Sequence, residues 1–169
     1  GHVQFRGPSA TSGYYRNPQA TRELVRADGW LETGDLGYVS DGELFLTGRN
    51  KDLIIKGGRN LHPHEAEEVV GDIPGIRKGC VAAFGVSDPG TGTERFVIVA
   101  ETRATSNEER AAIQALVFES VSVALGIPPD TVVFGAPGSV LKTSSGKIRR
   151  RATRVAYLAG HLSRRRPSL

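Results

Sequence analysis

The sequence is poor in cysteine and lacks long apolar stretches. Cys80 is the only cysteine among 169 residues, which excludes an internal disulfide framework and fits a reducing cytoplasm. It lies in the apolar segment 80–84, so we interpret it as a small residue of a buried strand rather than a nucleophile. No apolar run approaches the length that crosses a bilayer, and residues 1–6 lack the basic start and apolar core of a signal peptide.

Acidic residues are missing from the C-terminal end of the sequence. From Lys147 to Leu169 no aspartate or glutamate balances the basic side chains, although the formal net charge of the chain is only +4. A basic segment of this kind can bind nucleic acid or an acidic membrane surface. This one contains a single aromatic residue, Tyr157, and no nucleic-acid-binding motif. We therefore favour a solvated basic end and expect no nucleic-acid partner.

Glycine is frequent instead, with 21 residues, and it divides the chain into short elements. The first part predicts a short helix that starts at Asn17-Pro18, and a hairpin formed by 36–39 and 43–47 around the turn Ser40-Asp41-Gly42. No helix here is large enough to cover the strands. Residues 1–50 therefore predict the end of a larger, β-rich domain, and we place a domain boundary in the charged connector 48–52.

The second part predicts a compact α+β unit. Its helices are expected from Pro63 onward, from Ser106 or Asn107 to Gly126, and from 147 to 159. Its strands are expected at 53–56, 80–86, 95–102 and 131–134, with a tight turn at 57–60.

A lysine-bearing loop, residues 141–150, precedes the last predicted helix. Leu141 and Ile148 replace the first glycine and the Ser/Thr of a Walker A loop, so the segment is not one. A lysine on such a loop can meet a phosphate or carboxylate oxygen. Taken alone, a Gly-Lys pair before a basic helix is most often a solvated loop followed by a solvated helix face. Ser144 and Ser145 have no base or orienting carboxylate at a suitable spacing, which argues against a serine hydrolase.

Four other positions combine suitable chemistry with an ordinary structural alternative. Asp35 could accept hydrogen bonds from a ribose diol, or it could form an Asx-type turn. Arg49 could donate to ribose or phosphate oxygens, or it could be a common surface arginine. Gly57-Gly58 could let the backbone approach a ligand, or it could simply bend a hairpin. The run 62–65 holds metal-ligand residue types, but no second Cys/His pair follows, so we interpret it as a helix start.

Taken in order along the chain, these segments resemble the C-terminal portion of the adenylate-forming superfamily. That superfamily includes acyl-CoA synthetases, fatty acyl-AMP ligases, peptide-synthetase adenylation domains and luciferases. The resemblance covers nearly the whole chain and rests on the segments 1–8, 13–21, 28–37, 48–58, 63–67 and 142–148.

The resemblance implies a two-step reaction. A carboxylate attacks the α-phosphate of ATP, which gives an acyl-adenylate and pyrophosphate. A thiol of CoA, or of a carrier protein's phosphopantetheine, then attacks the acyl carbon. The small C-terminal domain rotates between the two half-reactions. A positioned ammonium suits the negative charge that gathers at phosphorus during the first step, and a mobile domain can withdraw it afterwards.

The same resemblance gives each candidate residue a role. Lys147 is the catalytic lysine that reaches carboxylate and phosphate oxygens during adenylation. Asp35 holds the ribose hydroxyls of the nucleotide, with Arg49 beside it. Lys51 is the hinge, and Gly58 lies on the turn that faces the thiol channel after rotation. We expect no protein metal ligands among them, and we expect ATP with Mg²⁺ to be bound mainly by an N-terminal domain.

The resemblance also implies a fold and a domain division. Residues 1–50 would be the C-terminal end of the large N-terminal domain. Residues 51–169 would be the mobile C-terminal domain, an α+β domain with a central, mainly antiparallel sheet flanked by helices. Nothing in the sequence matches the family's Ser/Thr/Gly-rich phosphate loop or its acyl pocket. We therefore expect a fragment that does not adenylate alone.

Two departures bear on the reaction. Leu141 stands where many members carry proline, and the segment 58–61 is closer to fatty acyl-AMP ligases than to acetyl-CoA synthetases. The expected substrates are a carboxylic acid, with a fatty acid favoured, together with ATP and CoA. The alternatives are a fatty acyl-AMP ligase that loads an acyl carrier protein, and a non-catalytic binding module with the same fold. Charge alone suggests that Arg164, Arg165 and Arg166 dock an acidic carrier protein.

Overall fold

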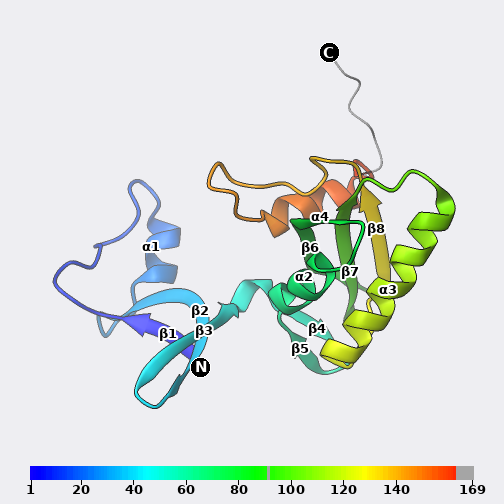
Figure 1. The fold of residues 1–169 in the computed structure, drawn as a ribbon. Helices are drawn as coiled ribbons and strands as arrows, with labels where there is room; N and C mark the ends of the chain where they lie inside the picture. Colours follow the sequence, from blue (N-terminus) through cyan, green and yellow to red (C-terminus); the bar gives the residue numbers. More distant parts are fainter. Residues whose placement is uncertain (91, 163–169) are drawn as a thin grey trace. The chain divides into compact units, whose positions relative to one another are not determined.

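The computed structural model describes residues 1–90 and 92–162, and the chain forms two compact units, Gly1–Lys51 and Asp52–Leu169 (Figure 1). The arginines at 164–166 lie outside the described residues. No helix in the described part of the chain is long and apolar enough to cross a membrane.

The first unit is a three-stranded antiparallel sheet with one short helix. Its strands are β1 (His2–Phe5), β2 (Leu31–Ser40) and β3 (Glu43–Arg49), in the order β1-β2-β3. The β2–β3 hairpin closes through Asp41 and Gly42, whose φ angles of 50° and 81° are those that a two-residue hairpin turn requires. Helix α1 (Pro18–Leu24) begins where Asn17 caps it by accepting a hydrogen bond from the Ala20 amide. The predicted hairpin and helix are both confirmed.

The second unit is built on a three-stranded sheet in the order β6-β7-β8. Strands β6 (Ile76–Asp88) and β7 (Thr93–Thr102) are antiparallel, while β8 (Thr131–Gly135) runs parallel to β7 after the helix α3 (Asn107–Leu125). The short 3-10 helix η1 (Asn50–Asp52) leads into a small hairpin of β4 (Ile54–Lys56) and β5 (Arg59–Leu61). Helices α2 (Pro63–Gly71) and α4 (Arg150–Leu158) complete the unit (Figure 1). The predicted α+β class with mainly antiparallel sheets is confirmed.

Both faces of the central sheet are buried. One face packs against α2 and α3. The inward side chains of α3, Ile113, Val117 and Val121, recur every four residues. The other face packs against α4 and the segment around Val140. Successive residues of β6 therefore serve different clusters: Val81 and Ala83 belong to the first, and Ala82 and Phe84 to the second. Because β7 is the middle strand, its residues 96–100 are fully buried.

Helix α3 begins and ends at the expected signals. Ser106 and Glu109 form a capping box at its start, and Gly126 follows its end in the left-handed conformation, with φ of 71°. Cys80 is buried in β6, as expected for a core residue, and its sulfur accepts a hydrogen bond from the Lys142 ammonium at 3.2 Å.

Two predicted boundaries are wrong. The turn at 57–60 is shorter, because Arg59 and Asn60 pair with Lys56 and Ile55 as strand residues. The last helix begins at Arg150 rather than at Lys147, because residues 143–147 form a closed loop held by its own hydrogen bonds.

Candidate functional site

The loop that carries Lys147 is short and internally hydrogen-bonded. The Thr143 amide donates to the Lys147 carbonyl at 2.9 Å, and the Thr143 hydroxyl oxygen accepts from the Lys147 amide at 3.0 Å. The Gly146 amide donates to the Thr143 carbonyl, which requires the positive φ of 81° that glycine adopts at this position. Thr143 thus fixes the backbone of Lys147, while the Lys147 side chain stays exposed.

Both ends of this loop are anchored in the core of the second unit. The Leu141 amide donates to the hydroxyl of Thr153, a fully buried residue of α4, and the Leu141 carbonyl accepts from the Arg149 amide at 2.8 Å. Ile148 packs against the cluster on the α4 side of the sheet. The loop is therefore held at both ends, and it exposes the ammonium group of Lys147.

Glu101 holds the segment that leads into the loop. Its side chain is only 2% exposed, and its Oε1 atom accepts hydrogen bonds from the Gly138 amide at 2.8 Å and the Val140 amide at 2.9 Å. Its other carboxylate oxygen pairs with Arg77. Sequence reasoning missed this residue, although an acid within the apolar run 96–101 is a signal that a buried partner is needed.

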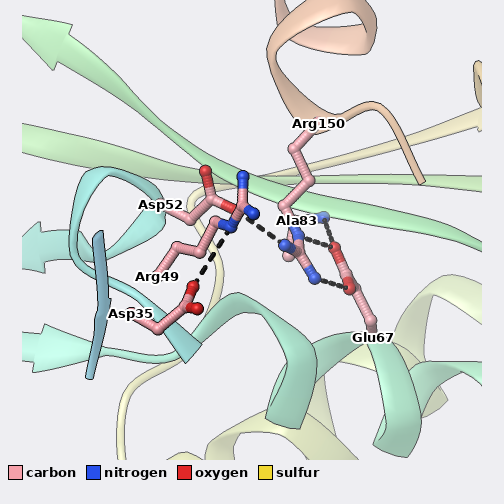
Figure 2. A network of polar contacts seen from close by, with 6 residues as sticks. All are labelled: Asp35, Arg49, Asp52, Glu67, Ala83 and Arg150. Carbon is pink, nitrogen blue, oxygen red and sulfur yellow. Dashed lines mark hydrogen bonds and ion pairs between the residues drawn. The ribbon is translucent and has the colours of Figure 1, made fainter. Parts of the chain in front are cut away.

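A second group of charged residues lies just beyond the loop (Figure 2). Arg150 donates through Nε and Nη2 to the two oxygens of Glu67, each at 2.7 Å, and through Nη1 to Asp52 at 2.7 Å. The hydrogen bond with Glu67 raises the pKa of Arg150 above its ordinary value, more than burial lowers it. Glu67 also accepts from the Ala83 amide in β6 at 3.0 Å. None of these contacts was predicted from the sequence.

The Gly57-Gly58 turn protrudes from a well-supported hairpin. Both glycines have positive φ, 57° and 74°, and a Cβ atom on either would meet nothing within 4 Å. The Gly57 amide donates to the Thr93 hydroxyl, and Arg59 donates to the carbonyl of Leu125 at the end of α3. The turn is thus open at its tip and held from behind.

In the first unit, Asp35 and Arg49 face each other across β2 and β3. They are register partners, and the Nε atom of Arg49 lies 3.3 Å from Oδ1 of Asp35. The Asp35 side chain is 30% exposed and that of Arg49 is 70% exposed. Both groups can therefore still reach a ligand, since an exposed pair of this kind is held only weakly.

Lys51 ends the first unit, in η1. Its ammonium lies 3.2 Å from Oε2 of Glu23, and both side chains are largely exposed. The structure thus brings Asp35 and Arg49 together in the first unit, and places Gly58 and Lys147 on separate loops of the second.

The histidine-containing run 62–65 forms the start of α2. Pro63 is the first residue of the helix, and Glu65 lies in its first turn. The Nδ1 atom of His62 is buried without a hydrogen-bond partner. Across residues 1–90 and 92–162, no group of three or more His, Cys, Asp or Glu could hold a metal ion.

Known proteins resemble the chain in both sequence and fold, although no family model matches it. The 4-hydroxyphenylalkanoate adenylyltransferase of Mycobacterium tuberculosis is 36% identical over 181 residues, which cover 97% of this chain and 28% of that protein. The sulfoacetate–CoA ligase of Cupriavidus necator is 43% identical over 112 residues, which cover 66% of this chain and 22% of that protein.

The fold shows the same relationship. The structure of McyG A-PCP complexed with phenylalanyl-adenylate superposes with a TM-score of 0.83 at 35% sequence identity, covering 95% of this chain and 25% of that one. This chain thus spans about a quarter of the length of the proteins that it matches. Sequence and fold together show that the chain belongs to the adenylate-forming superfamily and corresponds to a C-terminal portion of its members.

Proposed function

We propose that this chain is part of an ATP-dependent enzyme that activates a carboxylic acid as its acyl-adenylate and then transfers the acyl group to the thiol of CoA. The observation that carries the proposal is the Lys147 loop. Its backbone is fixed by Thr143 and anchored at both ends, while its side chain is exposed. The relatives of this chain include an adenylyltransferase and a CoA ligase, which supports both half-reactions.

In the first half-reaction, a carboxylate oxygen bonds to the α-phosphorus of ATP and pyrophosphate leaves. We assign Lys147 to the stabilisation of the oxygens on which negative charge gathers. An ammonium placed there beforehand acts without reorganisation, which is why its rigid loop matters. Asp35 would hold the ribose hydroxyls of the nucleotide, and Arg49 would donate beside it.

In the second half-reaction, the thiol attacks the acyl carbon and AMP leaves. We assign Lys51 as the hinge about which a mobile domain, residues 51–169, turns between the steps. Residues 1–50 would then be the end of a large N-terminal domain. The Gly57-Gly58 turn would face the thiol channel, where its open tip leaves room for the pantetheine arm.

ATP in such reactions carries Mg²⁺, which neutralises phosphate charge when bound. The described residues offer no cluster of three or more protein ligands for a metal ion. We therefore assign the Mg²⁺ to the ATP phosphates and to the rest of the enzyme, and expect the 169-residue chain not to adenylate by itself. The single buried cysteine is compatible with a cytoplasmic enzyme.

The test uses the full-length enzyme with ATP, Mg²⁺ and a panel of fatty acids. CoA and a phosphopantetheinylated carrier protein are offered in parallel. Formation of acyl-CoA supports the proposal, whereas loading of the carrier alone would make the enzyme an acyl-AMP ligase that serves a synthase. Formation of neither product, with robust folding, would favour a non-catalytic binding module.

A further inference from the structure

Arg150 joins three parts of the second unit that lie far apart in the sequence. Asp52 immediately follows the hinge residue proposed above, Glu67 lies on α2, and Arg150 is the first residue of α4, three positions after Lys147 (Figure 2). One guanidinium therefore contacts the segment where the second unit begins and also anchors the end of the lysine loop.

All three nitrogen atoms of the Arg150 guanidinium donate hydrogen bonds. Glu67 takes two parallel hydrogen bonds, and Asp52 takes a third from the remaining nitrogen. Glu67 cannot turn away without also losing the Ala83 amide of β6. The Glu67 side chain is 9% exposed, and those of Arg150 and Asp52 are 25% and 29% exposed. These pairs are therefore screened less than exposed surface pairs.

We propose that Arg150 is a positioning residue that fixes Asp52 to the body of the second unit, so that the unit turns at Lys51 and not further along the chain. This inference rests on the proposed function, because it concerns how the same Lys147 is delivered. The segment that leaves the hinge and the base of the lysine loop then move as one body.

This attachment of Asp52 would let the turning domain place the Lys147 ammonium accurately against the reacting oxygens. Without the bond to Arg150, the backbone torsions at Asp52 and Leu53 add freedom between the hinge and the loop. A misplacement of about 1 Å at a reacting group can cost about 100-fold in rate. The affinity for ATP should change little, because we assign the nucleotide to Asp35, Arg49 and the rest of the enzyme.

Two variants separate the contacts. Asp52→Ala removes the acceptor for the Arg150 Nη1 atom and leaves both bonds between Arg150 and Glu67, so folding should be preserved. Arg150→Lys keeps the positive charge but cannot form the three-way fork. Arg151→Lys, at the next and exposed position of α4, is the matched control.

The experiment measures the two half-reactions separately in the full-length enzyme: ATP–pyrophosphate exchange, and acyl transfer from preformed acyl-adenylate. We expect Asp52→Ala to lower the kcat of adenylation about tenfold, with KM for ATP within about twofold of the wild type. Arg150→Lys should lose at least as much, and the control should match the wild type. The double variant should be no slower than Arg150→Lys alone, because both changes break one network.

The outcomes are distinct. Wild-type kcat in Asp52→Ala, or losses in the double variant that equal the product of the single losses, would overturn the inference. A fall in the active fraction without a change in kcat would also overturn it, since that is the signature of a purely structural role. A wild-type enzyme that forms no acyl-adenylate would instead overturn the proposed function, and the inference with it.

Discussion

Removing the carboxylate of Glu101 should destabilise the second unit and loosen the entry to the lysine loop. In Glu101→Ala the Val140 amide loses its acceptor in a buried position, the Gly138 amide loses one in a partly exposed position, and Arg77 loses its partner. A buried amide left unpaired costs about 1–3 kcal/mol. The Gly138 amide and the Arg77 charge, which water can reach, add less, so we expect a total loss of about 2–4 kcal/mol.

The assay is equilibrium denaturation of the 169-residue chain in urea, and the unfolding of each unit is followed by its own spectroscopic signal. Helices α2, α3 and α4 belong to the second unit, so far-ultraviolet circular dichroism mainly reports its unfolding. Trp30, the only tryptophan, lies in the first unit, and its fluorescence serves as the internal control. Glu101→Gln keeps an oxygen for both amides but loses the charge and the acceptor opposite Arg77, so its stability should fall between those of the wild type and the alanine variant.

A loss below about 1 kcal/mol in Glu101→Ala would refute this reasoning, because it would mean that the two amides find other acceptors at no cost. Equal stabilities of the glutamine and alanine variants would also contradict it, since the argument gives most of the energy to the retained oxygen.

Two further predictions concern the same loops. Thr153→Val removes the buried hydroxyl that accepts from the Leu141 amide, so the free energy of unfolding should fall by about 1–2 kcal/mol, and hydrogen exchange at Leu141 should accelerate; unchanged exchange would contradict this. Gly58→Ala introduces a Cβ atom into open space but at a φ of 74°, so strain of about 1 kcal/mol should be the only cost to stability. In the full-length enzyme this variant should slow acyl transfer more than adenylation, and equal effects on the two rates would contradict the role assigned to the turn.

Local chemistry made some of the fold predictable. The Asp41-Gly42 turn, the helix start at Asn17-Pro18 and the start of α3 at Ser106 each depend on residues close in sequence, and each occurs as predicted. Resemblance to the adenylate-forming superfamily identified the candidate residues themselves. Lys147 was recognisable because its neighbours match a motif, not because any physical signal sets it apart from other exposed lysines.

Long-range pairing was not predictable from the sequence. The segment that leads into the lysine loop is held by Glu101, which is 37 residues away from Gly138. The Arg150 contacts with Glu67 and Asp52 span 83 and 98 residues. In the sequence these charges are indistinguishable from the solvated charges of ordinary helix ends and connectors.

The most direct test of the central claim is ATP–pyrophosphate exchange by the full-length enzyme with Lys147→Ala, beside acyl transfer from preformed acyl-adenylate. Lys78→Ala, at an exposed lysine on β6, is the matched control. Removing one positioned electrostatic group typically costs about 100- to 1,000-fold in rate. We predict a loss of that size in exchange, with transfer nearly unchanged and the control like the wild type. Exchange at the wild-type rate in Lys147→Ala would contradict the role of this loop.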